Sequence, residues 1–272
     1  VVYGICSFTC LCIAISIFDI SITYNLGGWS PPYGIEYKID YFKSILLVVI
    51  TTVATAVVFL QKQSKIIPCL LLLKAGLLGM VITGDAFNVF VFLEVSSIST
   101  YVLVAMGASR DRRALTSSYN YLILGSIGAT FFVIGLGFLY METGTLNMAD
   151  MGHILAETGG GSRVAMVAFG FIIVGLGLKL AMFPLHMWLP GAYAYAPTPV
   201  TAFLASTATK AALYLLLRFV FFVFDPSFAY VADVLMIVLV GLGVTGMIFA
   251  SLQAIFQTDI RRMLAFSSVA QV

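Results

Sequence analysis

The chain has 272 residues, of which 61% are hydrophobic and 10% are charged. Soluble domains are roughly 45–50% apolar and about 25% charged, so this composition excludes an ordinary cytosolic enzyme, a disordered segment and a nucleic-acid-binding protein. The formal net charge of +2 is too small to indicate a polyanionic partner. At about 25–30 residues for one helix and its loop, the length fits roughly nine membrane-crossing helices.

Apolar runs, separated by polar or Pro/Gly-rich stretches, predict these helices in chain order. They cover residues 1–22, 40–60, 66–83, 86–107, 114–140, 164–188, 198–224 and 231–256, and a ninth run begins near residue 261. The runs are too long for strands and lack a two-residue alternation. We therefore predict an all-α polytopic membrane protein with a single transmembrane domain, residues 1–272. Because both ends fall within apolar runs, we expect it to be part of a longer protein.

Basic residues in the loops predict the orientation. Short cytoplasmic loops carry an excess of Lys and Arg, and the two sides of this chain differ by seven to three. The seven are Lys62, Lys65, Arg110, Arg112, Arg113, Arg261 and Arg262, and the three are Lys38, Lys43 and Arg163. We expect the first side to be cytoplasmic. Loops 23–40 and 142–163 are then external, and the three glycines at 159–161 make the second loop the most flexible.

Four charged side chains lie well inside predicted helices, namely Lys74, Glu94, Lys179 and Lys210. A charge near the bilayer centre costs about 2.5–3.5 kcal/mol on insertion scales. A rise of about 1.5 Å per residue places Glu94, Lys179 and Lys210 in one middle layer, because alternate helices run in opposite directions. Neighbouring groups of opposite sign bias each other's charge state, so we interpret these three as a proton relay. A static bridge between Glu94 and one lysine is the simpler alternative, but it would leave a second lysine unexplained.

The sixth apolar run contains a proline. Pro184 removes a backbone donor and clashes with the carbonyl of Leu180, so it predicts a broken helix that faces protein or water. Lys179 lies one turn before this break and His186 lies directly after it. Since histidine titrates near neutrality, His186 is either part of the relay or a structural residue hydrogen-bonded to a freed carbonyl. We expect Trp188, in the following loop, to anchor that loop at the membrane interface.

Other patterns narrow the function further. Glycines such as Gly170, Gly175, Gly241 and Gly243 are typical of closely packed apolar helices and not of nucleotide loops. No cofactor and no metal are expected, because the sequence lacks nucleotide loops and metal-ligand clusters. A structural scaffold and a transporter of anionic solutes are two further alternatives. The buried charges argue against the first, and the bulky apolar neighbours argue against the second.

Several segments resemble the proton-translocating subunit family that is shared by Mrp-type cation/proton antiporters, respiratory complex I and membrane-bound hydrogenases. The D-type subunits of Mrp antiporters are the branch that they resemble most. Residues 196–199, Ala-Pro-Thr-Pro, are shared more widely across the family. The segments that carry the resemblance are Gly27–Gly34, Thr83–Glu94, Gly144–Asp150, Lys179–Pro190 and Asp259–Ser268.

The resemblance implies a role for each buried residue. Glu94 corresponds to the glutamate of the family's fifth helix, Lys179 to the lysine of the broken helix, and Lys210 to the lysine that links two half-channels. His186 matches a position often held by His or Tyr, whereas Lys74 is outside the pattern. The family fold has about fourteen helices, with two five-helix repeats of inverted topology, and residues 66–224 correspond to the first repeat.

The expected function is therefore that of a proton-translocating subunit of a multisubunit Na⁺/H⁺ antiporter in the plasma membrane. The expected partners are other membrane subunits, lipid, protons and sodium, and no nucleic acid. The alternative is the equivalent subunit of a membrane-bound hydrogenase or complex I, where it would be a non-redox part of an oxidoreductase. The relay residues alone do not separate the two, because both functions need the same proton pathway.

Overall fold

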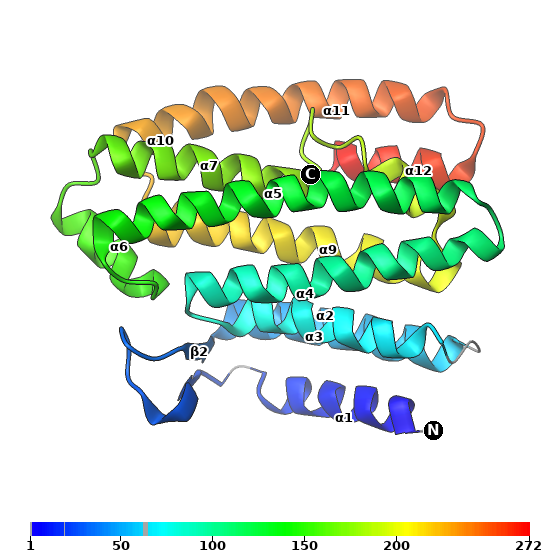
Figure 1. Ribbon diagram of the computed structural model, residues 1–272, viewed down its shortest axis with the longest axis horizontal. Helices are drawn as coiled ribbons and strands as arrows, with labels where there is room; N and C mark the ends of the chain where they lie inside the picture. Colours follow the sequence, from blue (N-terminus) through cyan, green and yellow to red (C-terminus); the bar gives the residue numbers. More distant parts are fainter. Residues whose placement is uncertain (1, 19, 62–64) are drawn as a thin grey trace.

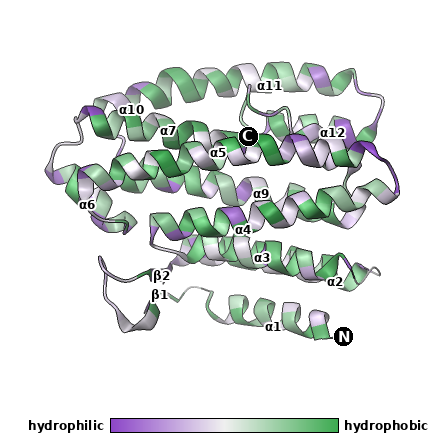
Figure 2. Cartoon of the chain, viewed as in Figure 1, coloured by the Kyte–Doolittle hydropathy of each residue, from purple (hydrophilic) through white to green (hydrophobic). Residues whose placement is uncertain are grey.

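A computed structural model describes residues 2–18, 20–61 and 65–272 of the chain. Long helices lie side by side along one direction (Figure 1). Six helical segments are long and apolar enough to cross a membrane: Tyr41–Leu60, Ala86–Ser109, Arg113–Thr143, Arg163–Leu180, Thr198–Val223 and Ala229–Ile255. Figure 2 shows apolar residues along most of these helices and strongly hydrophilic ones concentrated near the turns. The chain is thus a mainly helical membrane protein.

The bounds of the elements differ in places from the predicted runs. The first five helices are α1 (Val2–Ser16), α2 (Tyr41–Leu60), α3 (Ile67–Ile82), α4 (Ala86–Ala105) and α5 (Arg113–Thr143). They are followed by α6 (Met148–Glu157), α7 (Arg163–Leu180), α8 (Leu189–Tyr195), α9 (Thr198–Arg218), α10 (Ala229–Asp233), α11 (Val240–Ile255) and α12 (Ile260–Ala270). Two short 3₁₀ helices are η1 (Leu26–Gly28) and η2 (Met106–Ser109), and two π-helical turns are η3 (Phe219–Val223) and η4 (Val234–Leu239).

The expected count of about nine membrane helices is not confirmed in the described part of the chain. Besides the six long segments, α1 and α3 are apolar but have only 15 and 16 residues. The segment expected to begin a ninth span forms α12, which has 11 residues and follows a cap by Asp259. Composition alone does not predict where each of these helices ends, because apolar residues continue beyond the last hydrogen-bonded turn.

Both predicted external loops contain regular structure. The loop at 23–40 forms a hairpin in which β1 (Ile22–Asn25) pairs antiparallel with β2 (Glu36–Ile39). The loop at 142–163 contains α6, because the side chain of Asn147 accepts hydrogen bonds from the first free backbone N–H groups, 3.0 Å from Ala149 N. The prediction that this whole segment is a loop is therefore wrong.

The two predicted sides of the membrane are separated in space. The hairpin and α6 lie at one end of the helices, and the α4–α5 and α11–α12 turns lie at the other (Figure 1). In the α4–α5 turn, hydrogen bonds from Arg113 hold the pKa of Asp111 below its ordinary value. Which end is cytoplasmic stays a prediction. Lys62, one of the seven basic residues on the predicted cytoplasmic side, lies outside the described residues.

Helices α5 and α7 pack closely through glycine. A Cβ atom on Gly175 of α7 would lie 2.7 Å from both the carbonyl oxygen of Gly128 and the backbone nitrogen of Phe132 on α5. The predicted packing role of Gly175 is therefore confirmed. For Gly170, Gly241 and Gly243 the prediction is not confirmed, because a Cβ atom there would meet nothing within 4 Å among the described residues.

We expect Gly175→Ala to lower the stability of the protein by about 1–3 kcal/mol, the usual cost of overpacking, because neither backbone neighbour can retreat. Gly170→Ala makes the same chemical change on the same helix, where space is open, and should leave the melting temperature unchanged or slightly raised. Thermal unfolding of the purified protein in detergent measures both. An equal loss in the two variants would contradict the close contact.

Candidate functional site

The helix that carries Lys179 ends as Pro184 predicts. Helix α7 stops at Leu180, Ala181 adopts a left-handed conformation with φ 60°, and the next helix, α8, begins at Leu189. The carbonyl of Leu178, just before the break, accepts a hydrogen bond of 2.9 Å from the indole Nε1 of Trp188. A freed backbone group within the membrane is thus satisfied by the protein itself.

Trp188 does not anchor the loop at the membrane interface. Only 4% of its surface is exposed, and its ring stacks on Tyr121 with 3.9 Å between the ring centroids. The expectation of an interfacial anchor is wrong because the indole N–H finds its partner inside the protein, at the broken end of α7. Trp188 therefore closes the break from within.

Helix α4 presents polar side chains to this break. Glu94, Ser97 and Tyr101 are spaced by three and four residues, so they share one face of the helix. The ammonium of Lys179 donates a hydrogen bond to Ser97 Oγ, and it lies 6.0 Å from the centroid of the Tyr101 ring. Ser97 Oγ in turn donates to the carbonyl of Leu93 over 2.6 Å. The lysine is therefore held opposite the middle of this face, one turn away from Glu94.

Glu94 is partly buried and incompletely satisfied. Its Oε1 atom is shielded from solvent and has no hydrogen-bond partner among the described residues. Within the same residues, no amine lies within 4.0 Å of its carboxylate, so Glu94 and Lys179 do not form a direct ion pair. A buried acceptor without a partner costs about 1–3 kcal/mol, and more when it is charged. A proton, a water molecule or the ammonium of Lys179 would stabilise this oxygen by giving it a partner.

A small cavity of about 30 Å³ adjoins Lys179, where α3, α4, α7 and α9 meet. Its lining includes Lys179 and the hydroxyl-bearing residues Ser96, Ser97, Thr100, Tyr121 and Thr209. The hydroxyl of Thr209 is buried and has no partner within the described part of the chain. A cavity needs about 10–15 Å³ to hold a water molecule, together with two or more polar partners. The space therefore suits water between the lysine and Thr209.

Lys210 is not brought into this cavity. Its side chain is exposed, and its ammonium donates a 2.7 Å hydrogen bond to the carbonyl of Ala205 on its own helix. Successive residues of a helix are turned by about 100°, so Thr209 faces the cavity while Lys210 faces outward. The structure thus brings Lys179 to the Glu94 helix but leaves Lys210 on the outer face of α9.

His186 lies in a different place again. It is 3% exposed, it stacks on Phe183 with 5.4 Å between ring centroids, and neither ring nitrogen has a partner among the residues described. Both interpretations of His186, as part of the relay and as a structural residue, stay predictions. Beside it, at the end with the α11–α12 turn, is a polar hollow of about 430 Å³ lined by Met187, Gln253 and Phe266.

Sequence reasoning missed the two partners of the lysine on α4, the hydroxyl of Ser97 and the ring of Tyr101. Ser97 and Tyr101 lie three and seven residues after Glu94, and this helical spacing was the available signal. Lys74, to which the family pattern assigns no role, is buried but points the other way. Its ammonium donates to Ser7 of α1, 3.3 Å from the carbonyl oxygen and 3.2 Å from Oγ. It takes no part in the Lys179 cavity.

Known proteins are similar to this chain in sequence and in fold. Residues 83–272 match the family described as NADH:quinone oxidoreductase/Mrp antiporter, TM. The chain is 44% identical over 259 residues to the N subunit of NADH-quinone oxidoreductase of Desulforudis audaxviator, which covers 92% of this chain and 50% of the relative. It is 31% identical over 271 residues to the D subunit of the Na(+)/H(+) antiporter of Alkalihalophilus pseudofirmus, covering 96% and 53%. The chain spans about half the length of these curated relatives.

Solved structures of related membrane complexes are also similar to this chain. A chain of the membrane-bound sulfane sulfur reductase, an archaeal respiratory membrane complex, superposes with a TM-score of 0.90 at 33% identity, covering 99% of this chain and 56% of that one. A chain of the Mrp complex from Dietzia sp. has a TM-score of 0.88 at 25% identity, covering 99% and 51%. Both neighbours are parts of multisubunit membrane complexes. The chain therefore belongs to the NADH:quinone oxidoreductase/Mrp antiporter transmembrane family.

Proposed function

We propose that the chain translocates protons as a subunit of a multisubunit Na⁺/H⁺ antiporter. One observation carries the proposal: the ammonium of Lys179 rests on Ser97, one turn from a buried carboxylate oxygen of Glu94 that has no described partner. The residues assigned to the relay are Glu94, Lys179, Lys210 and His186. Membership in the family and the likeness to D-type antiporter relatives support it.

The relay works by changing the partner of one lysine. Ser97 and Glu94 are about one helical turn apart, about 5 Å along α4, which a flexible lysine side chain can cover. When Lys179 moves to Glu94, the ion pair stabilises the protonated amine. When it returns to Ser97, it loses that pair and passes its proton to water in the adjoining cavity. Thr209, which lines the same cavity, offers the next hydroxyl.

The two ends of the relay involve Lys210 and His186. Lys210 follows Thr209 directly, so it can take protons from the cavity side and present them on the outer face of α9. Because an ammonium facing lipid costs about 2.5–3.5 kcal/mol, we propose that polar groups outside the described residues cover it. His186 is assigned to proton exchange with the polar hollow beside Gln253. Residues 66–224, from α3 to α9, then form the first five-helix repeat.

A second candidate is the equivalent proton-pumping subunit of an oxidoreductase, either complex I or a membrane-bound hydrogenase. The 44% identity to an N-type oxidoreductase relative favours it, as does the TM-score of 0.90 to a chain of a respiratory membrane complex. The same four residues would move protons in that assembly. The two candidates differ in the driving force, which is a sodium gradient in the first and electron transfer in a partner subunit in the second.

We expect Glu94→Gln to reduce proton movement to about one hundredth, the usual loss for a group that must bind and release a proton, while the assembly stays intact. The measurement is the pH change in everted membrane vesicles that contain the complete assembly, after a sodium pulse or after an electron donor. Glu157→Gln, the same change on the exposed surface of α6, is the control. Response to the donor but not to sodium would favour the second candidate, and normal transport by Glu94→Gln would contradict both.

Substitutions of the lysines test their titration separately from their charge. Lys179→Ala should abolish most transport, and Lys179→Arg should not restore it, because arginine keeps its proton at every accessible pH. The same two substitutions at Lys210 should behave alike. Proton flux in reconstituted vesicles measures all four. Full activity with arginine at either position would show that only the positive charge matters there.

The structure predicts a positioning role for Ser97. Ser97→Ala removes the acceptor that holds Lys179 away from Glu94, so the transport rate should fall by about tenfold, the value of one hydrogen bond to a charged group. Ser99→Ala is the matched control, since Ser99 Oγ bonds only to Val95 of its own helix among the described contacts. The pH at which transport is half-maximal should shift in the first variant alone. An unchanged pH profile would show that Ser97 serves only in packing.

A further inference from the structure

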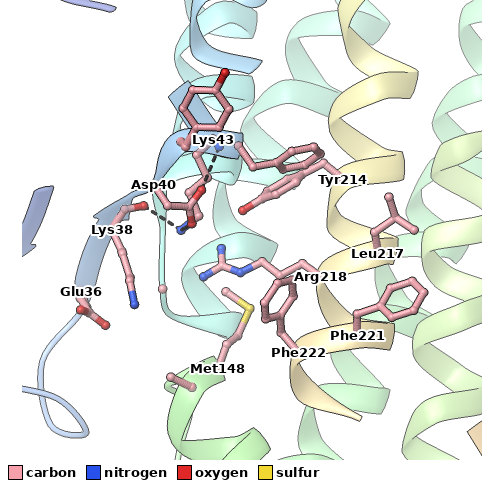
Figure 3. Close-up of a pocket in the computed structure, with 14 residues that line it drawn as sticks. Glu36, Lys38, Asp40, Lys43, Met148, Tyr214, Leu217, Arg218, Phe221 and Phe222 are labelled. Atoms are coloured by element: carbon pink, nitrogen blue, oxygen red, sulfur yellow. Dashed lines mark hydrogen bonds and ion pairs between the residues drawn. The ribbon is translucent and has the colours of Figure 1, made fainter. Parts of the chain in front are cut away.

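A second hollow, of about 890 Å³, lies at the end of the molecule that carries the hairpin. Figure 3 shows it between β2, the first turn of α2 and the last turns of α9. The wall formed by β2 and the start of α2 is charged, with Glu36, Lys38, Asp40 and Lys43, whereas the wall formed by α9 is mainly apolar and carries Arg218. The proposed relay uses none of these residues.

Of the three cations, Lys38 and Arg218 have N–H donors available for a ligand, whereas Lys43 does not. Lys43 is 3% exposed and its ammonium is already engaged, 2.7 Å from the carbonyl oxygen of Lys38 and 3.9 Å from Asp40. By contrast, Arg218 uses one N–H group, on the carbonyl of Thr83, and the Lys38 ammonium has no partner within residues 2–18, 20–61 and 65–272. These two side chains project into the hollow from opposite walls (Figure 3).

The sum of the charges favours a singly charged anion. Three basic and two acidic side chains line the hollow, so the lining has one excess positive charge in the formal count. A phosphodiester, with a single negative charge, neutralises that excess. Its oxygens also suit the donors of arginine and lysine, because hydrogen bonds between ionised groups are the strong ones.

The apolar wall distinguishes an amphiphile from a free anion. Leu217, Phe221 and Phe222 line the hollow from α9 and the π-helical turn that follows it. Phe221 is 50% exposed and Phe222 is 76% exposed, and both belong to a segment long and apolar enough to cross the membrane. A free phosphate would leave this apolar surface uncovered. Hydrocarbon chains would cover it and gain about 25 cal/mol for each Å² buried.

We propose that this hollow binds a phospholipid, with its phosphodiester between Lys38 and Arg218 and its acyl chains on Phe221 and Phe222. Among the described residues, the carboxylate of Glu36 accepts only one long hydrogen bond, 3.5 Å from Asn147 Nδ2, so it can also accept from the hydroxyl or ammonium donors of a glycerol or ethanolamine head group. A choline head group has no such donor and binds less well. This site is independent of the proposed relay.

The test measures lipid binding to the delipidated, full-length protein in detergent, by native mass spectrometry and by fluorescence titration. Long-chain phosphatidylglycerol is compared with long-chain phosphatidylcholine, with dihexanoyl phosphatidylglycerol and with inorganic phosphate. Lys38→Gln should weaken binding of the long-chain phosphatidylglycerol by about tenfold, the loss of one charge-assisted contact. Lys65→Gln, an exposed lysine at the opposite end, should leave the affinity unchanged.

The apolar wall has its own variant. Phe222→Ala should weaken binding of the long-chain lipid but not change the ratio between glycerol and choline head groups. Arg218→Gln should resemble Lys38→Gln, but it also removes the contact with Thr83. The decisive variant is therefore Lys38→Gln, because the ammonium of Lys38 makes no such contact with the described residues and its loss leaves the fold intact.

Three results would overturn the proposal. Lys38→Gln and Lys65→Gln could bind phosphatidylglycerol equally well, which would remove the head group from this hollow. Inorganic phosphate could compete as strongly as the long-chain lipid, which would show a site for free anions. Finally, a Lys38→Cys cross-linker could capture another segment of the same chain in place of lipid, which would show that the protein fills the hollow itself.

Discussion

The free energy of holding an ammonium inside the hydrocarbon layer governs this structure. Lys179 must have polar partners at a depth where water is scarce, and the fold supplies them from two directions. Helix α7 breaks directly after the lysine, and the exposed backbone is satisfied by Trp188. Helix α4 then brings Ser97 to the amine and leaves Glu94 one turn away. The geometry of the proposed proton site is thus a consequence of satisfying one buried charge.

Close helix contacts decide which parts of this site can move. Gly175, one turn before Lys179, places α7 against the backbone of α5, and a Cβ atom at Gly76 of α3 would lie 2.8 Å from the backbone nitrogen of Ser96 on α4. The helices that carry Glu94 and Lys179 are therefore held by close backbone contacts. What remains free is the lysine side chain, whose rotamers interconvert in picoseconds to nanoseconds when unhindered. The proposed relay would therefore need only a side-chain motion of Lys179 and no movement of a helix.

The sequence predicts the features that carry a large free-energy penalty and misses those that carry a small one. Buried charges such as Glu94 and a proline inside an apolar run stand out, because each carries a penalty of a few kcal/mol. Hydroxyls such as Ser97 do not stand out, since a serine in a membrane helix can bond to its own backbone at little cost. The position of Trp188 is hard to predict because its amphipathic ring suits both an interface and a broken helix. The cap of α6 by Asn147 lies in a segment whose glycines favour a loop.

The outward position of Lys210 indicates what kind of surroundings the outer face of α9 needs. Thr209 faces the cavity, and the next residue, Lys210, faces away from it. These two consecutive residues therefore lie between the enclosed cavity and the outer face of α9. An ammonium left against lipid there would cost about 2.5–3.5 kcal/mol, and its only described acceptor is a carbonyl of the same helix. On the proposed function, we expect the outer face of α9 to be a contact surface, because a polar surface that meets it would lower the energy of its lysine.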